Sequence, residues 1–330
     1  MPWDTRRIAR AGLPRVPADR QCRDTSRPRC QVLRGSCVAS RGAGASLLGR
    51  ILDDNTRVEG DALEINRAWW DGAAAIHGDD PIYDTDALIA GADWLGEEEQ
   101  TALTASVGSV DGLDVIHVQC HIGFDTISLA RRGARVTGLD FSPAALAKAQ
   151  DLARRSGVEA TWVQADAARI PADLHGRFDL AYATIGAISW IEDLPAWMHA
   201  VAATLRPGGR LVLVEVHPLL TMVAEREPFS LDFPYSFDGP HRFNEPGTYA
   251  DPSAELPSSE TVNFAHSLGE TITAAIEAGL RIDSLTEHVE TSKSPRPPIV
   301  PREADGRYRL RLDGQPLPIL FTLLATKLDS

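Results

Sequence analysis

The sequence is poor in cysteine and in positive charge, and it lacks long apolar runs. Four cysteines in 330 residues exclude a small disulfide scaffold, and we expect reduced thiols in a cytoplasmic protein. No run reaches the roughly 18 to 20 apolar residues that a membrane-spanning helix needs, so we expect a soluble protein without a membrane partner. The formal net charge of −13 argues against nucleic acid as a partner, because phosphate contacts need clustered cations.

The first fifty residues differ in composition from the remainder of the chain. They contain eleven Arg and no Lys against three Asp, a net charge of +8, whereas the rest of the chain carries −21. They also contain Cys22, Cys30 and Cys37, whose spacings of eight and seven residues do not match the close ligand pairs of a zinc site. No apolar periodicity runs through them. We therefore expect residues 1–60 to form a disordered or non-native leader and residues 61–330 to form the folded domain.

Apolar spacing predicts an alternating order of helices and strands after residue 61. Three helices come first, over 66–77, 84–92 and 97–107. Short β-branched runs then alternate with helices, which predicts strands at 115–118, 135–139, 161–163, 178–183, 210–216, 280–289 and 319–327 and helices at 126–132, 143–155, 194–205 and 267–278. Such alternation is typical of parallel sheets. We therefore expect an α/β fold with a doubly wound, mostly parallel seven-stranded sheet and helices on both faces.

A segment rich in proline and aromatic residues interrupts this alternation. Residues 228–257 hold six prolines and six of the 14 Phe and Tyr residues of the chain. Disordered linkers are poor in aromatic residues, so we expect an ordered loop, which either seals the edge of the sheet or covers a substrate. In the second case, the helices within 61–110 act as a lid, and residues 219–261 form a substrate-side insertion.

Candidate ligand-binding residues follow the first three expected strands. In an open parallel sheet, ligands bind beyond the carboxyl ends of the strands, beside the first strand. The first turn contains one glycine, Gly123, and matches neither the dinucleotide fingerprint nor a P-loop. Asp140 ends the second strand, where a carboxylate accepts hydrogen bonds from both hydroxyls of a ribose. Asp166 follows the third strand, where it either accepts from an adenine amine or caps a surface helix.

The order of these segments resembles a class I S-adenosylmethionine-dependent methyltransferase. The resemblance is carried by VIHVQCHIG, VTGLDFSPAAL, VQADAARIP, FDLAYATIGAI and LRPGGRLVLVEVHP. The QCHxG form of the first motif, residues 66–83 and residues 266–282 are similar to a bacterial subgroup that methylates small molecules. The resemblance implies a Rossmann-like methyltransferase fold and S-adenosylmethionine as cofactor. It implies cofactor contacts from Gln119, His121, Gly123, Asp140, Phe141, Asp166, Ala167 and Thr184.

The first motif departs from the pattern of that family. Where the family carries D-x-G-x-G-x-G, this chain has His117, Gln119, His121 and Gly123. The missing acid normally helps to hold the methionine ammonium, so that group needs another partner or the amino-acid end binds differently. An inactive site is the alternative. His117 and His121 are four residues apart, but they lie in a strand and a turn rather than on one helix, so we expect no metal.

The acceptor side is less strongly indicated by the sequence. The expected reaction is methyl transfer to a small molecule, in which positioning and exclusion of water supply much of the acceleration. His217, just past the fifth strand, is the candidate general base, and a structural histidine that caps the strand end is the alternative. His77 and His266 are weaker candidates near the acceptor. The candidate walls of the acceptor pocket are the aromatic residues Trp70, Tyr83 and Trp190, the last of which packs equally well in a core.

Two other functions remain compatible with these motifs. A non-catalytic protein that binds an adenosyl ligand would explain the altered first motif. A nicotinamide-dependent oxidoreductase would use the same ribose-binding acid, but this chain lacks the glycines that let a pyrophosphate approach. The sequence assigns neither the methylated atom nor the oligomeric state.

Overall fold

The computed structural model describes residues 62–78, 80, 82–223, 230–296 and 299–329. The leader expected over residues 1–60 lies outside these residues. The chain divides into two units, residues 1–44 and 45–330, and all described residues belong to the second unit.

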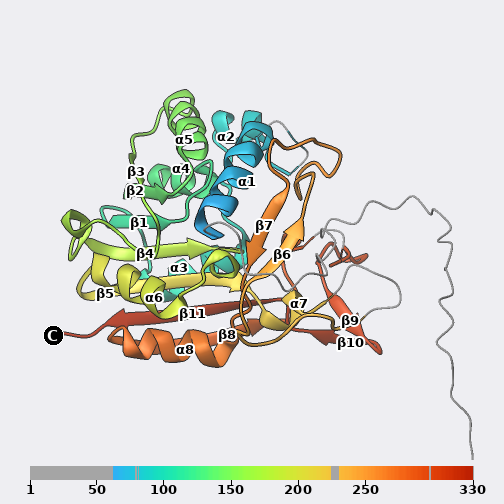
Figure 1. Ribbon diagram of the computed structural model, residues 1–330. Helices are drawn as coiled ribbons and strands as arrows, with labels where there is room; N and C mark the ends of the chain where they lie inside the picture. The colour runs from blue at the N-terminus through green and yellow to red at the C-terminus, as the bar shows by residue number, and fades with distance from the viewer. Residues whose placement is uncertain (1–61, 79, 81, 224–229, 297–298, 330) are drawn as a thin grey trace, which may run out of the picture. The chain divides into compact units, whose positions relative to one another are not determined.

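Seven strands of the second unit form one sheet in the order β3-β2-β1-β4-β5-β11-β8 (Figure 1). Their bounds are β1 Asp114–Val118, β2 Arg135–Asp140, β3 Thr161–Gln164, β4 Phe178–Thr184, β5 Leu205–Val216, β8 Leu280–His288 and β11 Leu320–Lys327. Strands β1 to β5 pair in parallel, and β11 runs antiparallel to both of its neighbours. The predicted mostly parallel seven-stranded sheet is confirmed. Its strand order reverses at β1, between β2 and β4, which is where ligands bind in such sheets.

Helices cover both faces of this sheet. Their bounds are α1 Ala62–Ile76, α2 Thr85–Ala90, α3 Glu97–Val107, α4 Phe124–Arg131, α5 Pro143–Arg155, α6 Leu194–Thr204, α7 Pro218–Thr221 and α8 Leu268–Glu277. The alternation of side chains along β5 assigns the faces. Leu211 and Leu213 belong to the apolar cluster of α6 and α8, whereas Val212 and Val214 belong to the cluster of α3 and α4.

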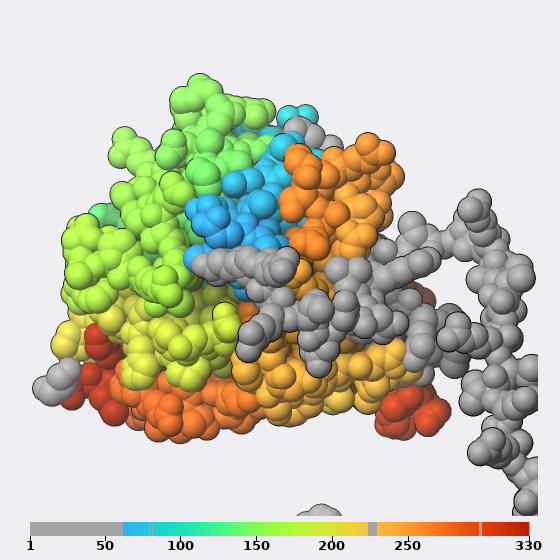
Figure 2. Space-filling view, in the orientation of Figure 1, coloured from blue at the N-terminus to red at the C-terminus, as the bar shows by residue number. Residues whose placement is uncertain are grey.

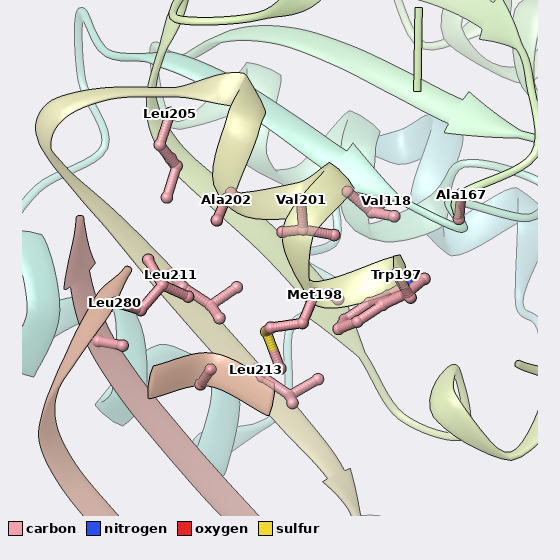
Figure 3. Close-up of a cluster of buried hydrophobic side chains, with 14 of the residues drawn as sticks. Val118, Ala167, Trp197, Met198, Val201, Ala202, Leu205, Leu211, Leu213 and Leu280 are labelled. Atoms are coloured by element: carbon pink, nitrogen blue, oxygen red, sulfur yellow. The ribbon is translucent and has the colours of Figure 1, made fainter. Parts of the chain in front are cut away.

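The larger apolar cluster lies under α6 (Figure 3). Trp197, Met198 and Val201 of this helix are fully buried against the sheet. Burying a side chain of this size contributes about 1.5 to 3 kcal/mol. Because strands such as β5 are buried on both faces, they read in the sequence as nearly continuous apolar runs, and this made them recognisable.

Two helix starts follow the signals in the sequence. The Ser142 side chain accepts a hydrogen bond from the Ala145 N–H at the start of α5, where Pro143 takes the first helical position. Ser267 and Glu270 form a capping box at the start of α8, in which each side chain accepts from the other residue's backbone N–H. These caps satisfy N–H groups that have no partner inside the helix.

The segments expected as loops contain short strands. Residues 219–261 include the hairpin strand β6 His241–Asn244 and the first half of its partner β7 Glu260–Asn263. The link after β8 contains β9 Leu310–Leu312 and β10 Gln315–Leu317, and two single 3-10 turns occur at η2 Ala172–Leu174 and η3 Ile188–Trp190. Strands of three or four residues are too short to show a periodic pattern. No helix in the described part of the chain is long and apolar enough to cross a membrane.

Candidate active site

A cavity of about 740 Å³ lies at the carboxyl ends of the central strands. Its volume is within the range of small-molecule sites. Six of the eight expected cofactor residues line it, and they come from the loops that follow β1, β2 and β4. These six are Gln119, His121, Gly123, Asp140, Phe141 and Thr184.

The loop after β1 keeps a left-handed backbone although glycine is absent from two of its positions. The φ angles of Gln119 and His121 are 58° and 49°. A residue with a Cβ pays roughly 1 to 2 kcal/mol for this conformation. Gln119 offsets that cost, because its Nε2 donates to the Ala187 carbonyl at 3.0 Å and its Oε1 accepts from the Trp197 indole at 2.9 Å. The side chain thereby fixes the loop to the end of β4 and to α6.

Gly123 is the glycine that this loop requires. Its φ angle is +80°, and an added Cβ would lie 2.7 Å from the Trp162 ring and 2.9 Å from the Ala149 Cβ. Gly123 also forms the N-cap of α4. Its lack of a side chain therefore lets α4 begin directly behind the loop.

His121 links the loop to two other elements. Its backbone N–H donates to Oδ2 of Asp140 at 2.8 Å, and its ring Nε2 lies 2.7 Å from Nδ1 of His77, just after α1. Burial lowers the pKa of His77 to about 4 and that of His121 well below its usual range. Both rings are neutral at pH 7, so one donates to the other.

Asp140 is a buried carboxylate at the tip of β2. Its Oδ1 accepts from the Ser142 N–H at 2.9 Å, and its other oxygen accepts from the N–H of His121. Burial raises the pKa of Asp140 to about 6, although these N–H groups oppose the shift. Each carboxylate oxygen keeps a second acceptor position, so this side chain is able to bind the two hydroxyls of a ribose.

Two of the expected cofactor residues do not line the cavity. Oδ1 of Asp166 accepts from the Ala168 N–H at 2.9 Å, which is a local turn contact, and no helix begins at this residue. Ala167 is buried in the apolar cluster beneath α6. The structure therefore places both residues in the turn after β3 rather than in the cavity wall.

Two buried acids line the cavity near the position where the first motif lacks one. His117 is buried and bonded to Thr126, and burial lowers its pKa to about 3, so it carries no charge at pH 7. Asp125 of α4 and Glu99 of α3 line the same cavity. Burial raises the pKa of both carboxyls, that of Glu99 to about 8. No motif singles out Glu99, whose helix is predicted from its apolar spacing alone.

The expected general base, His217, is placed differently from the prediction. Its Nδ1 accepts from the Leu219 N–H at 3.1 Å, and its Nε2 lies 2.8 Å from a Glu287 oxygen. The ring caps α7 and does not line the cavity. This corresponds to the structural alternative, because both ring nitrogens are already hydrogen-bonded.

The weaker histidine candidates also lie outside the cavity wall. Nε2 of His266 is bonded to the Ile191 carbonyl at 2.6 Å. His77 is not among the lining residues, but its ring contacts His121, Tyr83 and Tyr249, which are.

The three expected aromatic residues do line the cavity. Trp70 contacts Trp190 edge-on, with 5.1 Å between the ring centroids, and the Tyr83 hydroxyl lies 2.6 Å from that of Tyr249. Trp69 stacks on Trp190 at 5.7 Å. Residues of α1, of the loop after β4 and of the insertion thus form one aromatic wall. Figure 2 shows α1 (blue) directly beside the orange segment that contains β7, with which it is in contact.

The sequence of the central strands matches a known family. Residues 115–209 match the model of the family described as "Methyltransferase domain". Ubiquinone biosynthesis O-methyltransferase of Azotobacter vinelandii is 28% identical over 143 residues, which are 43% of this chain and 55% of that protein. The protein of the same name from Leptothrix cholodnii is 29% identical over 157 residues, 47% of this chain and 60% of its own. The chain thus spans little more than half the length of these curated relatives.

A solved structure shares the fold. An S-adenosylmethionine-dependent methyltransferase from Mesorhizobium loti superimposes with a TM-score of 0.50 at 24% identity, covering 72% of this chain and 100% of that one. The matched segment includes the loop after β1, Asp140 and the end of β4, which line one side of the cavity. Residues 115–209 therefore match the methyltransferase-domain family, and the chain shares the fold of a solved S-adenosylmethionine-dependent methyltransferase.

Proposed function

We propose that this protein transfers a methyl group from S-adenosylmethionine to a small-molecule acceptor. The observation that carries the proposal is the cavity itself, which joins the buried carboxylate of Asp140 to an aromatic wall formed outside the central sheet. The printed names of the curated relatives, which are O-methyltransferases, support a small acceptor. The comparisons give no support to a non-catalytic module or to a nicotinamide oxidoreductase.

The cofactor side of the cavity fits the chemistry of the adenosyl group. Asp140 would accept from the ribose hydroxyls, and the backbone of the left-handed loop would lie against the ligand at the start of α4. Thr184 would contribute to the same wall, where its hydroxyl already donates to Oδ2 of Asp125 at 2.8 Å. When bound, S-adenosylmethionine supplies a methyl group activated by the positive charge on its sulfur.

Asp125 and Glu99 are suited to replace the acid that the first motif lacks. Burial raises the pKa of both groups, although the ammonium of Lys293, which lines the same cavity, opposes the shift. A ligand ammonium between them would restore the charged forms. We therefore assign the methionine ammonium to these two side chains, one on α4 and one on α3.

The remaining work of the protein is positioning and exclusion of water. The aromatic wall covers the acceptor side, and Trp70 and Trp190 would also attract a cationic sulfur through their ring faces. Holding two reactants in a reactive geometry accounts for much of the acceleration in displacements of this kind. His217 has no part in this proposal. A cytoplasmic location and the absence of a nucleic-acid partner remain predictions from the sequence.

Isothermal titration with S-adenosylhomocysteine tests the cofactor side, and release of methyl groups to a panel of phenols, amines and thiols tests the reaction. We expect binding of the adenosyl ligand and turnover with at least one acceptor class. Asp140→Asn should weaken binding by about tenfold, because hydrogen bonds to a charged acceptor are lost. Wild-type protein that fails to bind S-adenosylhomocysteine would contradict the proposal.

A further inference from the structure

The hairpin of β6 and β7 presents one of its faces to the cavity. The two strands pair antiparallel, with His241 opposite Asn263. Successive side chains point to opposite faces, so His241 and Phe243 share the face of Asn263, and all three line the cavity. Asn244 points to the other side and is exposed.

Buried hydrogen bonds fix this hairpin against the rest of the site. The side-chain amide of Asn66 on α1 donates to the Val262 carbonyl and accepts from the Val262 N–H, both at 2.8 Å. The indole of Trp69 donates to the Glu245 carbonyl at 3.2 Å. These bonds set the position of the hairpin relative to α1, so the direction of its inner face is specified.

Asn263 carries a polar atom without a partner on that face. Its Nδ2 is buried, and within the part of the chain that the structure describes it makes no hydrogen bond. A buried donor that loses its bond to water and gains no other costs about 1 to 3 kcal/mol. Because the hairpin is fixed, relaxation of the backbone does not remove this cost. The amide therefore points to a ligand oxygen that accepts from it.

His241, opposite Asn263, is oriented by a carboxylate. Its Nε2 lies 2.6 Å from Oδ1 of Asp238. A carboxylate only accepts, so Nε2 carries the hydrogen, and in the neutral ring Nδ1 keeps its lone pair. Nδ1 has no hydrogen bond to any described residue. In this arrangement the Asp238 carboxylate holds His241 in one tautomer, which leaves Nδ1 able to act as a base.

Large aromatic rings line the same cavity as these two polar groups. Trp69, Trp190 and Phe264 line the same cavity as Phe243. Trp69 and Trp190 stack with an interplanar angle of 24°, so their rings lie in nearly parallel planes in the cavity wall. Flat walls with few polar groups favour a planar, largely apolar ligand.

We propose that His241 and Asn263 together bind one hydroxyl group of a planar aromatic acceptor, and that this oxygen is the atom methylated. A hydroxyl donates one hydrogen and accepts through its lone pairs, so it satisfies Nδ1 of His241 and Nδ2 of Asn263 at once. The opposing side chains of an antiparallel pair have their Cβ atoms about 5 Å apart, close enough to converge on one oxygen. This assignment rests on the proposed methyl transfer and specifies its acceptor.

The proposed step moves one proton and one methyl group. The acceptor O–H proton passes to Nδ1 of His241, and the imidazolium that forms is paired with Asp238. The oxygen lone pair forms the new bond to the methyl carbon, and the pair of the broken carbon–sulfur bond stays on sulfur. Asn263 donates to the oxygen while negative charge develops on it. An ammonium acceptor has no lone pair for Asn263, so the site discriminates against protonated amines.

Binding to the complex with S-adenosylhomocysteine tests the assignment without turnover. The probes are 2-naphthol and naphthalene, which share a ring system and differ by the hydroxyl. We expect 2-naphthol to bind at least tenfold more tightly than naphthalene, measured by isothermal titration. Asn263→Leu should remove most of this difference by weakening 2-naphthol alone, and Asn244→Ala on the outer face should change neither affinity. Equal affinities of the two probes in the wild type would overturn the proposal.

Spectroscopy and kinetics test His241 separately. In protein labelled with 15N-histidine, 2-naphthol should shift the Nδ1 signal of His241, and an unchanged signal would count against the contact. With a phenol that is turned over, His241→Gln should lower kcat by about 100-fold or more with little change in KM, in the range of a general base. Asp238→Asn should lower kcat less, because the ring remains but its tautomer is no longer fixed.

The outcomes separate this inference from the proposed function. If the wild type fails to bind S-adenosylhomocysteine, the methyltransferase proposal itself fails. If S-adenosylhomocysteine binds, amines or thiols are methylated and 2-naphthol binds no better than naphthalene, only the assignment of the acceptor oxygen is wrong.

Discussion

The two walls of the cavity differ in how their polar atoms are satisfied. On the wall formed by the strand ends, Gln119 and Asp140 already bond to neighbouring elements of the protein. On the wall formed by α1 and the β6–β7 hairpin, the amide of Asn263 has a buried nitrogen with no partner among the described residues. The first wall is completed by the fold, whereas in our proposal the second is completed by its ligand.

This difference indicates which wall would bind the cofactor and which would bind the acceptor. The first wall follows from the topology of the sheet, because the strand order reverses at β1 and leaves a crevice there. The second wall is added by segments outside the central sheet. Changes to the first wall should therefore affect folding and cofactor binding, and changes to the second should affect the acceptor.

The largest effect is expected at the loop after β1. Gly123→Ala adds a Cβ within 2.7 Å of the Trp162 ring at a φ of +80°, so we expect a loss of about 2 to 4 kcal/mol in unfolding free energy. Gly176→Ala is the matched control, because it also has a positive φ but has open space around it, and it should lose about 1 kcal/mol. Urea unfolding measures both. Equal losses would show that the packing behind the loop is not tight.

The next effect concerns the attachment of the hairpin. Asn66→Ala removes two hydrogen bonds and leaves the N–H and carbonyl of Val262 without these partners, so we expect a loss of about 2 kcal/mol. The loss should be local. Amide exchange of Val262 should accelerate while S-adenosylhomocysteine binds as in the wild type, measured by hydrogen exchange and titration. A matching loss of ligand affinity would mean that the two walls are not independent.

Cofactor binding should depend on pH through Asp140. Its carboxylate form accepts from ligand hydroxyls, and its pKa of about 6 means that this form is lost as the pH falls through 6. From pH 7 to pH 5 the affinity for S-adenosylhomocysteine should fall by about tenfold. His77 gains its proton only near pH 4, so it does not contribute in this range. The nearby carboxyl of Asp71 supports the raised pKa. In Asp140→Asn this dependence should weaken and leave only the part that comes from Glu99 and Asp125, whose raised pKa values also make their charged forms decline with falling pH. Titration at several pH values checks it.

The smallest effect is expected at His217. Because its ring caps α7 outside the cavity, His217→Asn should keep a capping acceptor and change stability by about 1 kcal/mol or less. Turnover should stay within about twofold of the wild type. A fall of 100-fold, measured with the same phenol as for His241→Gln, would restore His217 as the base.

The same contrast explains how much could be predicted from the sequence. The β1 loop and Asp140 lie at the carboxyl ends of strands that are buried on both faces. The apolar runs of these strands are visible in the sequence and therefore locate the strand ends. Asn263 and His241 lie on strands of four residues within a segment rich in proline, where no period is visible. His217 follows β5 as expected, but α7 begins directly after it. Its ring nitrogen accepts a hydrogen bond from the start of that helix, so the ring does not face the cavity.

The bidentate contact of Asn66 also has a consequence for association between chains. A hairpin has free outer edges, and unpaired N–H and carbonyl groups on such an edge can add a strand from another molecule. At Val262, both groups of β7 are already occupied by a side-chain amide that imitates a neighbouring strand. The residue that fixes the hairpin therefore also occupies the point of this edge at which another strand would pair.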